Sequence, residues 1–451
     1  MKTNTINPSS SSSLPYDKIH NNARNHKNFT KSYKNGVPPI LLWFLGLTSC
    51  FSLFLLYSTN PFHFSSQQHI QQQQQKEERQ FPPITTRPHP IKQQSGDDKC
   101  DLFKGKWVPD LNGSQYTANS CTTIPESKNC FKNGRIDIDF VNWRWKPEGC
   151  ELPRFDPHTF LKIVGGKKLA FVGDSVARNH MESLLCLLSQ AEVPMDVHKD
   201  SEDRFRTWHF PSSNFTLMIF WSKFLVKSEE RMVNNSGTGS FNLHFDKIDE
   251  KWASKLPGLD YVIVSTAHWF FRKNYLYEQG KLIGCVYCDE PNTPELGLNY
   301  ALRMSIRSAL KYINNCKGCK KNMVTLIRTF SPAHFENGAW DTGGGCNRTS
   351  PHGEEKGKEI EMEKRFELEL RELQIEELER ARIEDKGEEK RKLRVLDITR
   401  AMLMRPDGHP GEFWGNKWMK GYNDCVHWCL PGPVDAWSDF LLAVLQKEVG
   451  L

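Results

Sequence analysis

The fold is decided by residues 168–188, KLAFVGDSVARNHMESLLCLL. The first five residues form a short apolar run, which is typical of a strand buried on both faces of a sheet. A Gly-Asp-Ser turn follows at residues 173–175, and a helical pattern begins at Val176. We therefore expect a strand, a tight turn and a helix in this order.

Further short apolar runs predict more buried strands at residues 216–221, 261–264, 324–328 and 395–398. Helical patterns lie between or after them, at 176–188, 296–313 and 434–447. Alternation of buried strand and helix predicts an α/β fold, in which a mainly parallel sheet is covered by helices on both faces. The predicted architecture is a three-layer α/β/α sandwich.

Ser175 is placed for chemistry. A serine directly after such a strand lies at the carboxyl edge of a parallel sheet, where open α/β folds bind ligands. Its own N–H lies at the positive end of the helix dipole and can stabilise an oxyanion. The structural alternative is a plain strand-to-helix loop in which Ser175 is the N-cap.

Asp424 and His427 form a second element, in the stretch DCVH. At this spacing the carboxylate can hold the imidazole by its Nδ1–H, which leaves Nε2 free to deprotonate a serine. Serine alone is a poor nucleophile, and a neighbouring imidazole is the common means of activating it. The two elements together indicate a Ser-His-Asp triad.

Longer motifs carry a resemblance to a known family. They are CDLFKGKWVPD (100–110), DFVNWRWKPEGCELPRF (139–155), GDSVARNHMESLL (173–185), AMLMRPDGHPG (401–411) and DCVHWCLP (424–431). The chain resembles the plant trichome-birefringence-like polysaccharide O-acetyltransferases, which belong to the GDSL/SGNH-type esterases. The residues that follow the serine look most like those of the branch of this family that acetylates xyloglucan. The resemblance implies an SGNH-like sandwich with a small disulfide-bearing subdomain.

By this resemblance, Ser175 is the nucleophile, His427 the general base and Asp424 the residue that orients it. Acetyl would pass to Ser175 and then to a hydroxyl of a hemicellulose, most simply xyloglucan. Candidate oxyanion donors are the N–H of Ser175 and the side chains of Arg178 and Asn179. We expect no bound cofactor and no metal, and an acetyl donor of unspecified identity as co-substrate.

Three alternatives remain open at this point: a mannan or glucomannan O-acetyltransferase, a polysaccharide acetylesterase of the same fold, and a non-catalytic polysaccharide-binding protein. One departure from the family pattern also matters. Many members carry N-T-G-H-W after the central strand, whereas residues 265–269 read STAHW. If that Asn binds the oxyanion, Arg178 and Asn179 matter more here. His268 is expected to be a packed histidine or a substrate-site residue.

The chain has 13 cysteines, of which 12 remain once Cys50 is assigned to the apolar N-terminal segment. An even number favours disulfides in an oxidising compartment. Two CxxC pairs could instead form a zinc ribbon, although disulfides are favoured. These pairs are Cys285/Cys288 and Cys316/Cys319. For the other eight, the resemblance implies Cys100–Cys150, Cys121–Cys186, Cys130–Cys429 and Cys346–Cys425.

The first hundred residues predict a membrane anchor and a stem. Residues 1–36 hold six basic residues against one acid, and residues 37–57 carry no charge. Twenty-one uncharged, mostly apolar residues suffice to span a bilayer, and the basic arm favours a cytosolic N-terminus. We expect a type II signal anchor rather than a cleaved signal peptide. The Gln- and Pro-rich stretch 58–98 predicts a disordered stem.

A cysteine-bearing subdomain at 99–167 and a catalytic domain at 168–451 would follow. Four glycosylation sequons lie beyond the anchor, at Asn112, Asn214, Asn234 and Asn347. Together these features predict a Golgi membrane protein with a lumenal catalytic domain. Since the basic surplus lies mostly in the N-terminal arm, nucleic acid is excluded as a partner.

The segment 353–392 holds fifteen acids and eleven bases. Pairs at Glu361/Arg365, Glu367/Arg371 and Glu376/Arg380 have the spacing of i,i+4 ion pairs. We expect a long, solvated helical insertion with one apolar edge. The alternative is a coiled-coil surface for a protein partner.

Overall fold

The computed structural model describes residues 100–385, 391–415 and 421–451. The predicted basic tail, signal anchor and stem lie outside these residues. Within the described part of the chain, no helix combines the length and apolarity needed to cross a bilayer.

The central sheet has seven strands in the order β13-β12-β9-β3-β6-β5-β4. Five are parallel, and two at one edge are antiparallel. The parallel strands are β3 (Lys168–Gly173), β6 (Phe215–Trp221), β9 (Tyr261–Ser265), β12 (Val324–Arg328) and β13 (Lys392–Leu396). The edge pair is β5 (Phe205–Phe210) and β4 (Met195–Lys199). All five predicted strands are therefore present, the last beginning three residues earlier than expected.

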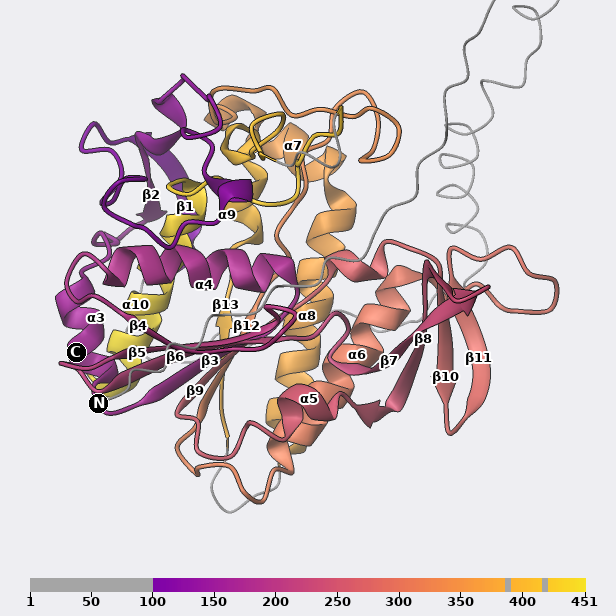
Figure 1. The fold of residues 1–451 in the computed structure, drawn as a ribbon. Helices are drawn as coiled ribbons and strands as arrows, with labels where there is room; N and C mark the ends of the chain where they lie inside the picture. The colour runs from indigo at the N-terminus through magenta and orange to yellow at the C-terminus, as the bar shows by residue number, and fades with distance from the viewer. Residues whose placement is uncertain (1–99, 386–390, 416–420) are drawn as a thin grey trace, which may run out of the picture. The chain divides into compact units, whose positions relative to one another are not determined.

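Helices cover both faces of this sheet (Figure 1). Alternate residues of β3 divide between two cores: Leu169 and Phe171 enter one, and Ala170 and Val172 enter the other. The first core contains residues of α3 (Pro157–Val164), α4 (Ser175–Leu188) and α10 (Ala436–Val449). The second contains residues of α5 (Glu250–Ala253), α6 (Gly297–Asn314) and α8 (Arg365–Glu384). The predicted three-layer α/β/α sandwich is confirmed.

The order of the parallel strands makes β3 a topological switch point. Its two sheet neighbours are β6 and β9, so the chain continues first to one side of β3 and later to the other. Ligands in open α/β sheets bind outside the carboxyl ends of the strands at such a switch point. The turn after β3 carries Ser175.

The charged segment differs from its prediction. Helix α8 is the crossover between β12 and β13, and it packs against α6. Leu370 is fully buried and Glu377 is 1% exposed, so this helix is part of the sandwich rather than a solvated insertion. The predicted pairs Glu367/Arg371 and Glu376/Arg380 do not form. Arg371 pairs instead with Asp397, Glu376 with Arg303 of α6, and Glu367 with Lys364 at the start of α8. Arg380 pairs with Glu377 and Glu384 of its own helix. The side chain of Glu361 lies outside the described residues.

Two small sheets lie outside the sandwich. The first is within the predicted cysteine-bearing subdomain at 99–167, although its strands were not predicted. Its antiparallel strands β1 (Asp101–Pro109) and β2 (Trp143–Glu148) pack on α9 (Thr399–Leu403), where the Trp107 indole donates to the Ala401 carbonyl at 2.7 Å. A second sheet has the order β11-β10-β8-β7. Its strands are β7 (Val226–Val233), β8 (Ser236–Ile248), β10 (Asn274–Glu278) and β11 (Lys281–Val286). A short helix α7 (Gly357–Glu363) precedes α8.

Six disulfides join the described cysteines. Four are the pairs implied by the resemblance: Cys100–Cys150, Cys121–Cys186, Cys130–Cys429 and Cys346–Cys425. Each CxxC pair closes on itself, at Cys285–Cys288 and Cys316–Cys319. The disulfide interpretation of both pairs is therefore confirmed. The zinc ribbon would need both pairs at one ion, but they lie at opposite ends of the 18-residue α6, about 27 Å long.

Two partly buried carboxyl groups next to α4 make stability depend on pH. Burial raises the pKa of Asp435 to about 6 and that of Asp439 to about 7. Asp435 accepts from Tyr116 and Ser183, and Asp439 accepts from the Phe155 N–H. Because the folded state favours the protonated acids, their contribution is greatest near pH 4 and is lost as pH rises through 6 to 7.

We expect the Asp439→Asn variant to lose part of this pH dependence. An amide cannot ionise, so the variant should lose less stability than the wild type as pH rises. The difference in free energy of unfolding, variant minus wild type, should increase by roughly 1–3 kcal/mol between pH 5 and pH 8. Chemical denaturation at both pH values measures this difference. Parallel curves for the two proteins would contradict the assignment.

Candidate active site

Ser175 is the first residue of α4, and the preceding Asp174 is its N-cap. The Asp174 carboxylate accepts from the N–H groups of Val176 and Ala177, and also from those of Ala267 and His268. The alternative in which Ser175 caps the helix is therefore wrong. Since Asp174 satisfies the helix start, the partly exposed Ser175 hydroxyl is left free for chemistry.

Gly173 allows this turn to pass close to the next strand. A Cβ at this position would lie 1.7 Å from the Ser265 carbonyl oxygen, where no side chain fits. The glycine therefore brings the ends of β3 and β9 together, directly before the serine.

Asp424 and His427 form the predicted pair. The Nδ1 of His427 lies 2.8 Å from Oδ2 of Asp424, and the other carboxylate oxygen accepts from the N–H groups of Val426 and His427. These contacts hold the pKa of the buried Asp424 well below its usual range, despite burial. The carboxylate thus stays ionised and directs the imidazole so that Nε2 faces away from it.

Asn179 joins the helix of Ser175 to the loop of His427. Its Nδ2 donates to the Trp428 carbonyl at 3.2 Å, and its Oδ1 accepts from the Trp428 N–H at 2.7 Å. Asn179 is fully buried and lies one turn after Ser175, while Trp428 follows His427. The two halves of the predicted triad are therefore held side by side. Ser175 and His427 make no direct hydrogen bond, and their catalytic pairing stays a prediction.

Further contacts fix the His427 loop. Disulfides at Cys425 and Cys429 flank the histidine on both sides. His409 lies with Nδ1 2.6 Å from the His427 carbonyl oxygen and stacks on Trp428 at 4.0 Å between ring centroids. The backbone around the predicted base is therefore constrained by two disulfides and by the contacts of His409.

The other oxyanion candidates have identifiable partners. The Arg178 guanidinium donates to the Asp203 carbonyl and lies 5.1 Å from the centre of the Trp221 ring. Asn179 is engaged by Trp428, so the structure adds a positioning role to the one predicted for it. The assignment of Ser175, Arg178 and Asn179 to an oxyanion hole stays a prediction.

The STAHW stretch lies against the same turn. The hydroxyl of Ser265 accepts from Arg328, a buried arginine that stacks on Trp437 at 4.6 Å. Burial lowers the pKa of Arg328 to about 10, and Asp174 opposes this. His268 stacks beside Phe330, with 5.1 Å between ring centroids, and burial lowers its pKa to about 4. His268 is partly exposed, so its role as a packed histidine or as a substrate-site residue stays a prediction.

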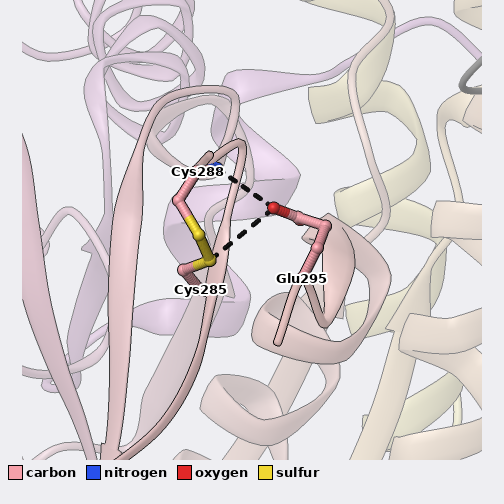
Figure 2. A group of neighbouring side chains, drawn as sticks. All are labelled: Cys285, Cys288 and Glu295. Atoms are coloured by element: carbon pink, nitrogen blue, oxygen red, sulfur yellow. Dashed lines mark hydrogen bonds between the residues drawn. A yellow bond between two sulfur atoms is a disulfide. The ribbon is translucent and has the colours of Figure 1, made fainter. Parts of the chain in front are cut away.

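The four predicted glycosylation residues, Asn112, Asn214, Asn234 and Asn347, are all exposed. One cluster among the described residues has the composition of a metal site: Cys285, Cys288 and Glu295. The two cysteines form a disulfide, and the Glu295 carboxylate accepts from the Cys288 N–H (Figure 2). The donor and acceptor atoms of this bond are 3.0 Å apart. Metal ligation needs thiolates. The oxidised pair is therefore a structural disulfide at the end of β11 rather than a pair of metal ligands.

Two family models match the chain. Residues 152–444 match the GDSL/SGNH-like acyl-esterase family found in Pmr5 and Cas1p, and residues 98–151 match the Pmr5 N-terminal domain. The chain belongs to this acyl-esterase family, as the sequence motifs implied.

The names of individual relatives are more specific than the family description. Xyloglucan O-acetyltransferase 3 of Populus trichocarpa is 57% identical over 404 residues, which cover 90% of this chain and 96% of that protein. Xyloglucan O-acetyltransferase 2 of Arabidopsis thaliana is 57% identical over 352 residues, covering 78% and 84%. Protein trichome birefringence-like 19 of Arabidopsis thaliana is 45% identical over 358 residues, covering 78% and 82%.

The link through Asn179 makes a prediction about rate. Asn179→Ala removes both bonds to Trp428, so the predicted base should move relative to Ser175, while the side chains of Ser175 and His427 are unchanged. We expect kcat to fall by about 100-fold, with a much smaller change in KM. Steady-state kinetics with an acceptor oligosaccharide measures both. Ser189→Ala, at the other end of α4, is the matched control. A change in KM alone would contradict the positioning role.

Proposed function

We propose that the chain transfers acetyl groups to hydroxyls of xyloglucan, through an acetyl-serine intermediate on Ser175. The observation that carries the chemistry is the Asp424–His427 pair, held beside the Ser175 turn by Asn179. The acceptor is inferred from the relatives named above at 57% identity.

The reaction would proceed in two displacements. His427 Nε2 takes the proton of the Ser175 hydroxyl as Oγ bonds to the acetyl carbonyl carbon, and it passes that proton to the leaving group of the donor. A sugar hydroxyl then attacks the acetyl-serine, with its proton taken by His427 and returned to Ser175 Oγ. Each step passes through an oxyanion, to which the Ser175 N–H can donate at the start of α4.

An aromatic pair near the triad supports a sugar acceptor. Trp340 and Tyr422 are 56% and 41% exposed, and their ring centroids are 6.4 Å apart. Tyr422 lies two residues before Asp424. Exposed aromatic faces next to a polar site are suited to bind the apolar face of a sugar ring.

We also propose the Golgi membrane as the location, with a single type II anchor at residues 37–57 and the catalytic domain in the lumen. The charge asymmetry around that segment supports this topology. Six disulfides and four exposed sequon asparagines are consistent with an oxidising lumen.

The full chain, solubilised in detergent, tests the proposal when it is incubated with an acetyl donor and either xyloglucan or mannan oligosaccharides. We expect a mass gain of one acetyl on xyloglucan oligosaccharides, lost in Ser175→Ala. Preference for mannan would reassign the acceptor. Release of acetate from a decorated oligosaccharide without transfer would indicate an esterase, and binding without turnover a polysaccharide-binding protein.

A further inference from the structure

Two cations and a tryptophan lie beside the Ser175 turn. We call Lys223, Trp269 and Arg272 the cationic rim. Lys223 Nζ lies 4.1 Å from the centre of the Trp269 ring, and Arg272 Cζ lies at the same distance. Two cations therefore converge on one aromatic side chain.

The rim is attached directly to the turn. The Thr266 hydroxyl donates to the Lys223 carbonyl at 2.6 Å and lies 3.5 Å from the Asp174 carboxylate. The residue before Trp269 donates its N–H to the same carboxylate. The residue before Lys223 donates its N–H to the Gly173 carbonyl at 2.7 Å. The rim thus follows the carboxyl ends of β6 and β9, on either side of β3.

Neither cation of the rim has an anionic partner among the described residues. Lys223 and Arg272 are both half-buried, and burial lowers the pKa of each. Glu230 acts on both from beyond ion-pair distance, while its carboxylate accepts from the Gly239 N–H at 3.0 Å. Glu202 is paired with Arg204 at 2.8 Å.

This arrangement contrasts with three half-buried arginines elsewhere in the fold. Arg303, Arg307 and Arg380 all bond to the carboxylate of Glu377. Partial burial of an unpaired cation costs free energy, because water is lost and no anion replaces it. Lys223 and Arg272 bear this cost beside the Ser175 turn.

We propose that Lys223 and Arg272 bind an anionic group, a phosphate or carboxylate, of a molecule that the enzyme uses. The inference rests on the proposed function, and we assign the anion to a phosphorylated acetyl donor. Glucan and mannan acceptors are neutral, so a charged group would come from the donor. Contacts to a remote phosphate would orient the acetyl ester toward Ser175 and lower the barrier through positioning.

The test compares the full-length wild type with Lys223→Met and Arg272→Met, alone and together. These changes remove charge and keep an extended apolar side chain. Lys281→Met, at the exposed first residue of β11, removes the same charge elsewhere. Pyrophosphate is the binding probe, measured by calorimetry at low salt. We expect the double variant to weaken pyrophosphate binding by at least about tenfold, because charge-assisted bonds are lost. Unchanged pyrophosphate binding would overturn the site.

Kinetics then identifies the source of the anion. We expect the ratio of kcat/KM for acetyl-coenzyme A to that for the uncharged p-nitrophenyl acetate to fall at least about tenfold in the double variant. An unchanged ratio, together with competition by trigalacturonate alone, would overturn the assignment to the donor and transfer the site to an acidic polysaccharide. Pyrophosphate binding requires no turnover. The anion-site proposal and the proposed function can therefore fail separately. Pyrophosphate binding could be unaffected by the double variant while Ser175-dependent hydrolysis of p-nitrophenyl acetate persists, or it could be weakened while that hydrolysis is absent.

Discussion

Ser175→Ala is expected to lower kcat for acetyl transfer by about 10⁴- to 10⁶-fold, the largest effect of any single substitution in this chain. The alanine removes the only atom that the proposed mechanism joins to the acetyl group. The residual rate would come from the oxyanion donors and from substrate binding. Initial rates with xyloglucan oligosaccharides measure the loss.

The fold should tolerate this substitution. The Ser175 hydroxyl has no hydrogen-bond partner among the described residues, and Asp174 caps α4 independently. We expect a thermal midpoint within a few degrees of the wild type. Ser189→Ala, at the C-cap of the same helix, should keep full activity. A Ser175→Ala enzyme that retains a tenth of the wild-type rate would reject Ser175 as nucleophile.

The second large effect is expected from Asp424→Asn, with kcat lowered by about 10⁴-fold. The buried carboxylate lies 2.8 Å from His427 Nδ1 and fixes the tautomer in which Nε2 can accept a proton. An amide of the same shape can donate to Nδ1, which favours the tautomer that carries its proton on Nε2. That form cannot deprotonate Ser175.

Rates measured at saturating acceptor separate this effect from binding. Asp196→Asn is the control, since Asp196 is an exposed residue of β4 that pairs with Arg206. We expect this control to retain wild-type kcat. A loss of less than tenfold in Asp424→Asn would mean that another group orients His427, or that His427 is not the base.

The central sheet could be predicted from the sequence because its strands are short apolar runs. Strands β3, β9 and β12 are buried on both faces, so their character is visible in consecutive residues. Strand β7 shows why the second sheet was missed. Its sequence, VKSEERMV, is mostly exposed, and its pairing with β8 depends on backbone bonds rather than on an apolar pattern.

Helix α8 was predicted as a helix and misplaced in the fold. Its many charges suggested solvent, but several of their partners lie on other elements, such as Arg303 and Arg307 of α6 bonding to Glu377. A sequence shows spacing within one helix and not the side chains that face it across a packed interface. Burial of Glu377 therefore could not be anticipated from periodicity.

The contacts in the candidate site are of two kinds: local ones, which could be predicted from the sequence, and long-range ones, which could not. Asp424 and His427 are three residues apart, so their contact is local and could be predicted. Asn179 and Trp428 are 249 residues apart, and the contact between Arg328 and Ser265 also depends on the sheet order. The sequence signal for Asn179 was its position one turn after Ser175, which suggested a catalytic donor. The structure shows that its amide bonds to the Trp428 backbone.

The account depends most on a covalent intermediate at Ser175. The direct measurement is intact-protein mass spectrometry of the wild type incubated with an acetyl donor and no acceptor, followed by peptide mapping. We predict one added acetyl group on Ser175, which disappears when xyloglucan oligosaccharide is added and never forms in Ser175→Ala. An enzyme that acetylates xyloglucan while no adduct forms on Ser175 would contradict the two-step mechanism.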